Sequence, residues 1–232
     1  MGKSLNQQAR GRGGPAWTVR RKAYIYKISY PSLDAKGTGK VLQLFNSTAH
    51  TTPLAKIMIN NEMFYVPAAN GLFEGQEISI DEGKIKDGNI VRLKDIHPGT
   101  KVFNIEFVPG KGGKIMRTSG GFAIVMNKDK GDVEVLIKRR KLKLNENCRA
   151  IIGIAAGSGR VLKPMVKAGN KHYLMKSKGK KWHFTSAIKT NALDHPFGSG
   201  RGKRIKSKIA QRNAPPGAKV GHLRPRRTGH IK

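Results

Sequence analysis

The strongest constraint on this chain is its positive charge, most of which has no acidic residue nearby to balance it. From residue 147 to the C-terminus the sequence holds 21 lysines and arginines and one acidic residue, Asp194. Like charges at this density repel one another and oppose compaction unless a polyanion binds. The formal net charge of the whole chain is +32, which is typical of a protein that binds a phosphate backbone. We therefore expect a nucleic-acid-binding protein.

Several other classes of protein are disfavoured by what the sequence lacks. Its longest aliphatic stretches, such as residues 150–152, are far too short for a transmembrane helix, and no apolar run near the start indicates a signal peptide. The single cysteine, Cys148, excludes internal disulfides and cysteine-rich zinc sites. We expect a protein of a reducing, intracellular compartment that has no membrane partner.

Charge also divides the chain into a nearly balanced middle and two basic ends. Residues 1–33 contain seven basic residues and no acidic one, whereas residues 34–146 contain 13 of the 14 acidic residues. The two ends are rich in glycine and show little hydrophobic periodicity. They are predicted to be arms that are largely disordered in isolation and become ordered on a polyanion.

The middle of the chain has the pattern of an all-β protein, with short apolar runs separated by turn residues. Asn60-Asn61 between two such runs predicts a tight hairpin with left-handed turn residues. The five runs on each side of a junction at residues 97–99 predict two small barrels. The expected strands are 41–45, 55–59, 63–67, 77–80, 90–95, 102–107, 114–117, 122–127, 133–138 and 149–155.

Three stretches have the composition of phosphate or base contacts. In the glycine-rich loop at residues 109–114, backbone amides could approach phosphates closely, although a plain hairpin turn explains the glycines equally well. The basic run at residues 176–181 leads into Trp182, and Trp17 lies among arginines of the N-terminal arm. Cations beside aromatic rings suit unpaired RNA, whose bases stack on such rings. The alternatives are a solvated charge run at 176–181 and a disordered targeting tail for the basic stretch at 201–208.

His195 is the one histidine with a neighbouring carboxylate in the sequence, that of Asp194. An enzymatic hypothesis would use His195 as a general base. Adjacent residues in an extended segment point apart, however, and no nucleophile or metal-ligand spacing accompanies the pair. A turn or an RNA contact is the better interpretation, and no catalytic residue is predicted.

Taken together, these stretches resemble the large-subunit ribosomal protein L2 family in its archaeal and eukaryotic form. The resemblance runs in order along almost the whole chain, with departures at residues 46–50 and 183–190. Its most recognisable element is Asn191 with Asp194-His195-Pro196-Phe197-Gly198. The other matching stretches are 2–13, 109–120, 148–153, 157–170 and 212–229.

The resemblance implies an OB-like barrel followed by an SH3-like barrel, with extended basic N- and C-terminal arms. The corresponding boundaries are 1–33 for the N-terminal arm, 34–96 for the first barrel, 97–172 for the second and 173–232 for the C-terminal extension. The implied partners are large-subunit ribosomal RNA, other large-subunit proteins and the small subunit across the subunit interface. Asp194 and His195 are expected near the peptidyl-transferase region. No cofactor is implied, although structural Mg²⁺ or K⁺ ions at the RNA interface are compatible with the resemblance.

A set of cationic, aromatic and polar residues is expected to contact RNA. The alternative function is that of a general DNA- and RNA-packaging protein, which would bind duplex DNA as well as it binds structured RNA. The expected RNA contacts are Arg10, Arg12, Trp17, Arg20, Arg21, Lys111, Lys114, Arg117, Arg160, Lys163, Lys167, Asn170, Lys171, Lys178, Lys180, Lys181, Trp182, Asn191, His195, Arg201, Lys203, Arg204, Arg212, Arg226 and Arg227.

Overall fold

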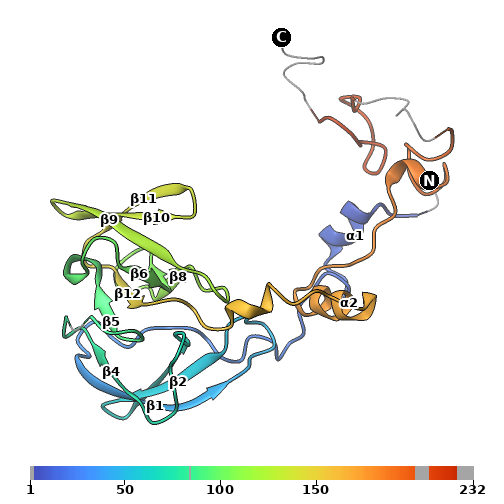
Figure 1. Ribbon diagram of the computed structural model, residues 1–232. Coiled ribbons are helices and arrows are strands. Elements are labelled where there is room, and N and C mark those ends of the chain that lie inside the picture. Colours follow the sequence, from blue (N-terminus) through green and yellow to red (C-terminus); the bar gives the residue numbers. More distant parts are fainter. Residues whose placement is uncertain (1–2, 84, 202–208, 224–232) are drawn as a thin grey trace. The chain divides into compact units, whose positions relative to one another are not determined.

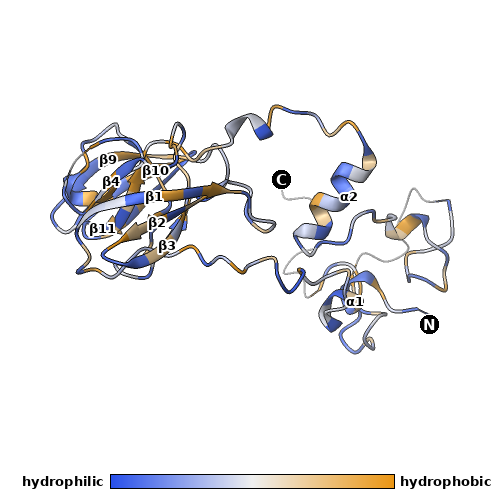
Figure 2. Ribbon diagram, turned by 90° about the horizontal axis from the view of Figure 1, so that it is seen from below, coloured by the Kyte–Doolittle hydropathy of each residue, from blue (hydrophilic) through white to orange (hydrophobic). Residues whose placement is uncertain are grey.

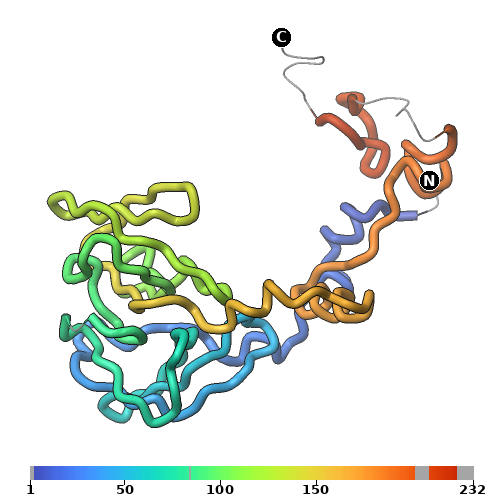
Figure 3. The backbone as a smooth tube through the Cα atoms, viewed as in Figure 1, coloured from blue at the N-terminus to red at the C-terminus, as the bar shows by residue number. Residues whose placement is uncertain are grey.

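The computed structural model describes residues 3–83, 85–201 and 209–223 (Figure 1). It divides the chain into two compact units. The β unit comprises residues 21–165, and the terminal unit combines the two ends of the chain, up to Arg20 and from Val166 on. In Figure 3 the blue N-terminal segment and the orange C-terminal segments together trace the terminal unit. The barrel and arm boundaries expected from the sequence stay predictions.

The β unit confirms the all-β prediction, because it consists of short strands and two single-turn helices. The two single-turn 3-10 helices are η1 (Leu93–Asp95) and η2 (Ser158–Arg160). The strands are β1 (Gly37–Phe45), β2 (Leu54–Ile59), β3 (Glu62–Pro67), β4 (Glu77–Ile80), β5 (Ile90–Arg92), β6 (Lys101–Phe103), β7 (Ile105–Glu106), β8 (Gly113–Ile115), β9 (Ala123–Asp129), β10 (Asp132–Ile137), β11 (Arg140–Asn145) and β12 (Arg149–Ile152).

Ten of these strands form one sheet, in the order β11-β10-β9-β6-β12-β5-β4-β1-β2-β3. Its central strands separate two hydrophobic cores. Successive side chains of a strand point to opposite faces, so Ile151 of β12 enters one core while Ala150 and Ile152 enter the other. Figure 2 shows apolar residues recurring along β1, β9 and β10. Two cores fit the expectation of two barrels, but the OB-like and SH3-like assignment stays a prediction.

The hairpin expected at Asn60-Asn61 is confirmed. These residues connect β2 to β3 with φ angles of 45° and 64°. Asparagine tolerates the left-handed conformation better than most residues, so it suits a two-residue turn of this kind.

The strand predictions were wrong in four places, each for a local reason. The run at 90–95 is a strand only as far as Arg92, because residues 93–95 form the helical turn η1. The run at 102–107 is split into β6 and β7 by Asn104, whose φ is 51°. The run at 149–155 ends at Ile152 because Gly153 has a φ of 106°. Strand β11 was missed altogether, because its sequence reads as a charge run in which only Leu142 and Leu144 face the core.

The terminal unit contains two helices that the sequence did not predict, α1 (Asn6–Arg12) and α2 (Ala168–Ser177), and the single turn η3 (Ala187–Lys189). Neither α1 nor α2 buries a residue. A helix without a buried face has no apolar stripe, so its sequence lacks the periodic apolar residues that predict a helix. Within the described part of the chain, no helix is long and apolar enough to cross a membrane.

Candidate nucleic-acid interface

The terminal unit contains a concave cleft of about 1000 Å³ that is lined by both ends of the chain. The N-terminal end contributes Trp17 and residues of α1, and the C-terminal end contributes residues between 175 and 195. Its cations are Lys3, Arg10, Lys178, Lys180 and Lys181. The structure therefore brings together residues that the sequence predicts separately as RNA contacts on the two arms.

Aromatic rings supply much of the apolar lining of this cleft, together with Leu5 and Met175. The centroids of Trp17 and Phe184 lie 5.6 Å apart in a tilted pair. Trp182 contacts His183 edge-on at 5.5 Å, and the Lys171 ammonium lies 5.3 Å from the Trp182 centroid. Rings beside cations provide the two ingredients of single-stranded nucleic-acid binding, a surface for stacking bases and charge for phosphates.

A glycine allows the two ends of the chain to approach one another. Gly179 follows α2 and has a φ of 60°. A Cβ at this position would lie 3.0 Å from backbone atoms of Thr18 and Val19, tighter than ordinary packing tolerates. Glycine therefore satisfies both the left-handed backbone and the close contact that holds residues 178–182 against the N-terminal arm.

The element containing Asp194 and His195 is a closed loop at one side of the cleft. The Ser199 N–H donates to the Thr190 carbonyl at 3.0 Å, and the Gly198 N–H donates to the His195 carbonyl at 2.8 Å. A Cβ on Gly198 would overlap the carbonyl oxygen of Asn191. These contacts fix the loop without a hydrophobic core of its own.

His195 is held as a neutral imidazole with a defined tautomer. Its Nδ1 accepts a hydrogen bond from the Phe197 N–H at 3.0 Å, and burial lowers the pKa of His195. Because Nδ1 accepts, the proton of the neutral ring sits on Nε2. An Nε2–H group can donate to a partner but cannot take a proton from a substrate, which argues against the general-base hypothesis.

Asp194 does not orient the imidazole. Its carboxylate instead lies 3.3 Å from the ammonium of Lys3 in the N-terminal arm. The two neighbouring side chains thus have different partners, although residues 192–194 form a turn and not the extended segment that the sequence analysis assumed. The Lys3–Asp194 pair is solvent-exposed enough to contribute little stability, but it places the arm beside the loop.

A second group of predicted contacts lies in the β unit, where three loops meet. Arg160 Nε donates to Ser119 Oγ at 2.9 Å, and Thr52 Oγ1 donates to the Arg117 carbonyl at 3.0 Å. The Ser119 N–H also donates to Thr51 Oγ1 at 3.3 Å. These hydrogen bonds join the loops that contain Arg117 and Arg160, which belong to the same unit.

The sequence analysis did not single out the histidine beside this group. Nδ1 of His50 lies 2.9 Å from Ser47 Oγ, and its ring packs edge-on against Tyr24. Burial lowers the pKa of His50, and the positive charge of Arg117 lowers it further. His50 is therefore neutral at pH 7, so the positive charge at these loops comes from the arginines.

The glycine-rich loop at residues 109–114 does not offer its amides to a phosphate. The N–H groups of Gly110 and Gly112 donate to the carboxylate of Glu106, at 3.3 and 3.1 Å. The loop thus wraps an internal anion, and the hairpin-turn interpretation was the better one. The side chains of Lys111 and Lys114 remain exposed.

The other predicted contacts are not gathered into either group. Lys203, Arg204, Arg226 and Arg227 lie outside the described residues. The sequence analysis missed Lys3 and Phe184 of the cleft. The predicted contacts that are exposed at scattered positions are Arg12, Arg20, Arg21, Lys163, Lys167, Asn170, Asn191, Arg201 and Arg212.

The described residues contain no group of three or more His, Cys, Asp or Glu side chains that could hold a metal ion.

Comparison with known proteins decides the family. A model of the C-terminal domain of ribosomal protein L2 matches residues 86–217. The large ribosomal subunit protein uL2 of Archaeoglobus fulgidus is 42% identical over 236 residues, covering 99% of each chain. The uL2 proteins of Ignicoccus hospitalis and Sulfolobus acidocaldarius are 41% and 37% identical, covering 99% of this chain and 95% and 98% of their own lengths.

The chain belongs to the uL2 family. The resemblance noted in the sequence is thereby confirmed over nearly the full length of the chain. As a uL2 member the chain is a structural ribosomal protein of the large subunit and not an enzyme.

Proposed function

We propose that this uL2 chain binds large-subunit ribosomal RNA through the cleft of the terminal unit, which takes an unpaired RNA segment. The single observation that carries the proposal is the convergence of Trp17, Trp182 and three neighbouring lysines on one cleft. Bases stack on the rings while Lys178, Lys180 and Lys181 neutralise the backbone. Trp17 and Trp182 are half-buried, and a duplex DNA packaging protein has no use for stacking rings in a cleft, which favours RNA over the packaging alternative.

In this proposal the two barrels, expected at residues 34–96 and 97–172, are the anchor of the protein, and Arg117 and Arg160 make further phosphate contacts on it. The basic arms reach between RNA helices. The proposed partners also include other large-subunit proteins and the small subunit, in the cytoplasm. The proposed place of Asp194 and His195 is near the peptidyl-transferase region, with the Nε2–H of His195 as a donor to RNA. Bound Mg²⁺ or K⁺ would neutralise phosphates that no side chain reaches.

Two substitutions separate the roles of the His195 nitrogens. Asparagine places an acceptor near Nδ1 and so retains the loop bond from the Phe197 N–H, but it lacks the outward donor. Glutamine places a donor near Nε2 and loses the loop bond. If the Nε2–H contacts RNA, His195→Asn reduces RNA affinity while His195→Gln retains more of it. The loop should stay ordered in His195→Asn and become less ordered in His195→Gln. The amide resonance of Phe197 reports this order.

The experiment that tests the cleft is RNA binding as a function of salt. The variant Lys178→Gln/Lys180→Gln/Lys181→Gln removes three lysine charges that are proposed to contact phosphates. It should reduce the slope of log affinity against log salt concentration by about 2. The matched control, Lys36→Gln/Lys40→Gln/Lys86→Gln, removes the same charge from exposed positions of the β unit. An equal reduction in both variants would show that only net charge matters. Sedimentation of the native protein with large subunits after a high-salt wash tests the ribosomal assignment itself.

A further inference from the structure

The β10–β11 hairpin ends in a cluster of cations that no expectation covered. Ile137 pairs with Arg140, so Lys138 and Arg139 form a two-residue turn. Lys138, Arg139 and Arg140 are all exposed, and among the described residues no acidic side chain pairs with any of them. Three adjacent unpaired cations at a hairpin tip repel one another, so the tip is electrostatically unfavourable until an anion binds.

The turn itself is conformationally strained. Lys138 has a φ of 57°, whereas Arg139 does not have a positive φ. A two-residue hairpin turn whose first residue alone is left-handed usually has glycine there, because a Cβ disfavours that conformation. Lysine provides a long cationic side chain at this position, although glycine would form the turn with less strain. Such strain is concentrated at functional sites.

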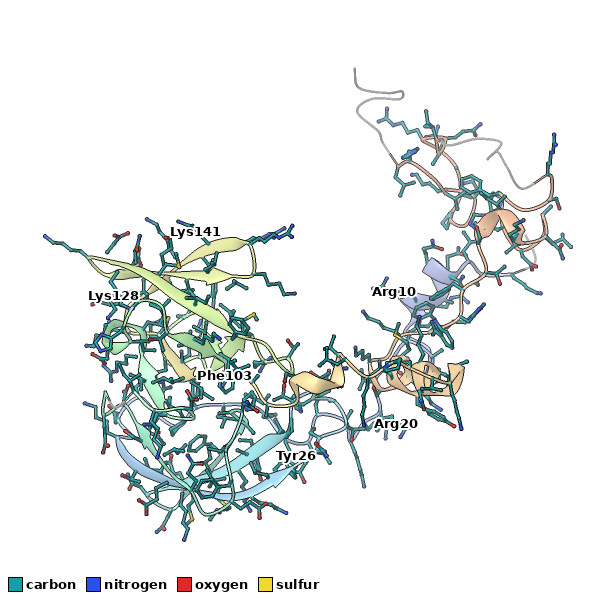
Figure 4. The ribbon with its side chains drawn as sticks, in the orientation of Figure 1. Arg10, Arg20, Tyr26, Phe103, Lys128 and Lys141 are labelled. Carbon is teal, nitrogen blue, oxygen red and sulfur yellow. The ribbon has the colours of Figure 1, made fainter. Side chains whose placement is uncertain are left out.

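The cations further down the hairpin differ from those at the tip because they have partners. Lys141 lies 3.2 Å from Glu134, and Lys143 lies 3.6 Å from Asp129. In Figure 4, Lys141 on β11 and Lys128 on β9 both extend at the margin of the β unit, whereas Phe103 lies within it. Within the β10–β11 hairpin, the charge without an acidic partner is therefore confined to the tip.

We propose that Lys138, Arg139 and Arg140 form a phosphate-binding site for the RNA backbone, separate from the cleft of the terminal unit. The inference rests on the proposed function for the identity of the polyanion. Arginine suits the role because its planar guanidinium donates two parallel hydrogen bonds to a phosphate. Direct contacts at this site position the hairpin on RNA without reading a base.

A different role for the charge is protection of a sheet edge. Strand β11 is the last strand of the sheet, and charged side chains on an edge strand prevent pairing with another chain. Protection of this kind works with either sign of charge, whereas phosphate binding requires positive charge. The Arg139→Glu/Arg140→Glu variant therefore separates the two roles: edge protection predicts a monomer with unchanged RNA affinity, and the phosphate site predicts a monomer with reduced affinity.

The test uses the full-length chain and purified archaeal large-subunit rRNA as the probe. We expect the Lys138→Gln/Arg139→Gln/Arg140→Gln variant to reduce the salt slope of binding by about 2. The control variant at Lys36, Lys40 and Lys86 should leave the slope nearly unchanged. Lys138→Gly should weaken binding and raise the midpoint of thermal unfolding, because it removes a charge and relieves the strained turn. That combination excludes misfolding as the cause of weaker binding.

The outcomes also distinguish this site from the proposed function. If the native chain binds the rRNA with a steep salt dependence and the tip variant matches it, the tip site is wrong and the cleft proposal stands. If rRNA binding is unchanged but incorporation into large subunits falls, the tip contacts an acidic protein and the RNA assignment is overturned. A native chain that shows no salt-dependent rRNA binding contradicts the proposed function and this site with it.

Discussion

The guanidinium of Arg149 and the carboxylate of Glu106 form a fully buried ion pair, 3.1 Å apart, between β12 and β7. Glu106 also accepts from the Arg149 N–H at 2.9 Å and from two amides of the glycine-rich loop. Arg149 reaches the carbonyls of Pro31 and Ser32. One internal charge pair thus ties the segment before β1, the glycine-rich loop and the central sheet together.

Replacing one partner of this pair should be far more damaging than replacing both. Arg149→Met leaves the Glu106 carboxylate buried without a counter-charge, and such losses cost roughly 3–5 kcal/mol of unfolding free energy. The double variant Glu106→Gln/Arg149→Met removes both charges and should be clearly less destabilised. Urea unfolding measures both. Equal destabilisation of the single and double variants would contradict a coupled pair.

Gly198 should be required for the loop at residues 190–199, because a Cβ there overlaps the Asn191 carbonyl. We expect Gly198→Ala to disorder the loop and to weaken rRNA binding. Gly169→Ala is the control, since a Cβ on Gly169 of α2 has open space around it, and alanine there should strengthen the helix by about 1 kcal/mol. Amide resonances of residues 190–199 report the difference.

Acid should loosen the same loop through His195. Burial lowers the pKa of His195 below its ordinary value of 6.5, so the neutral ring is favoured in the folded state. The resulting stability is fully present above pH 6.5 and is lost as the pH falls through the lowered pKa. An NMR titration should show the His195 and Phe197 signals shifting together below pH 6.5. A His195 pKa at or above 6.5 would refute the buried, hydrogen-bonded ring.

Tryptophan fluorescence should report on the cleft alone. The chain has two tryptophans, Trp17 and Trp182, and both line the cleft. Stacked bases should change their emission when rRNA binds, and Trp182→Leu should weaken binding by roughly 1–3 kcal/mol. The corresponding change at an aromatic residue outside the cleft, Phe122→Leu, serves as the control. Emission that is unaffected by saturating rRNA would place the RNA elsewhere.

Cys148 should be chemically inert in the folded chain. Burial raises its pKa to about 11, and the nearby Glu106 charge contributes in the same direction. At pH 8 only about one thiol in a thousand would be ionised, and the thiolate is the reactive form. Reaction with a thiol reagent should therefore follow unfolding. Rapid reaction of the native protein would contradict the buried position.

Local sequence alone determined the class of partner and most of the secondary structure. The excess of cations after residue 147 specifies a polyanion whatever the fold, because charge of this density needs neutralisation. Alternating apolar residues predicted nine of the strand regions correctly apart from their ends, and Asn60-Asn61 predicted its turn, because both signals depend only on neighbouring residues. The order of the stretches that match the family is also a property of the sequence alone, so it identified the family without the structure.

Tertiary structure decided which charged groups are internal and which are available to a partner. Nothing near Arg149 in the sequence shows that it is buried against Glu106, 43 residues away, or that the glycine-rich loop surrounds that carboxylate. The meeting of Trp17 with Phe184 and the acceptor role of the His195 Nδ1 likewise depend on how distant or turning segments pack. Local patterns record propensity and charge, whereas burial and the direction of a hydrogen bond arise only when the chain has folded.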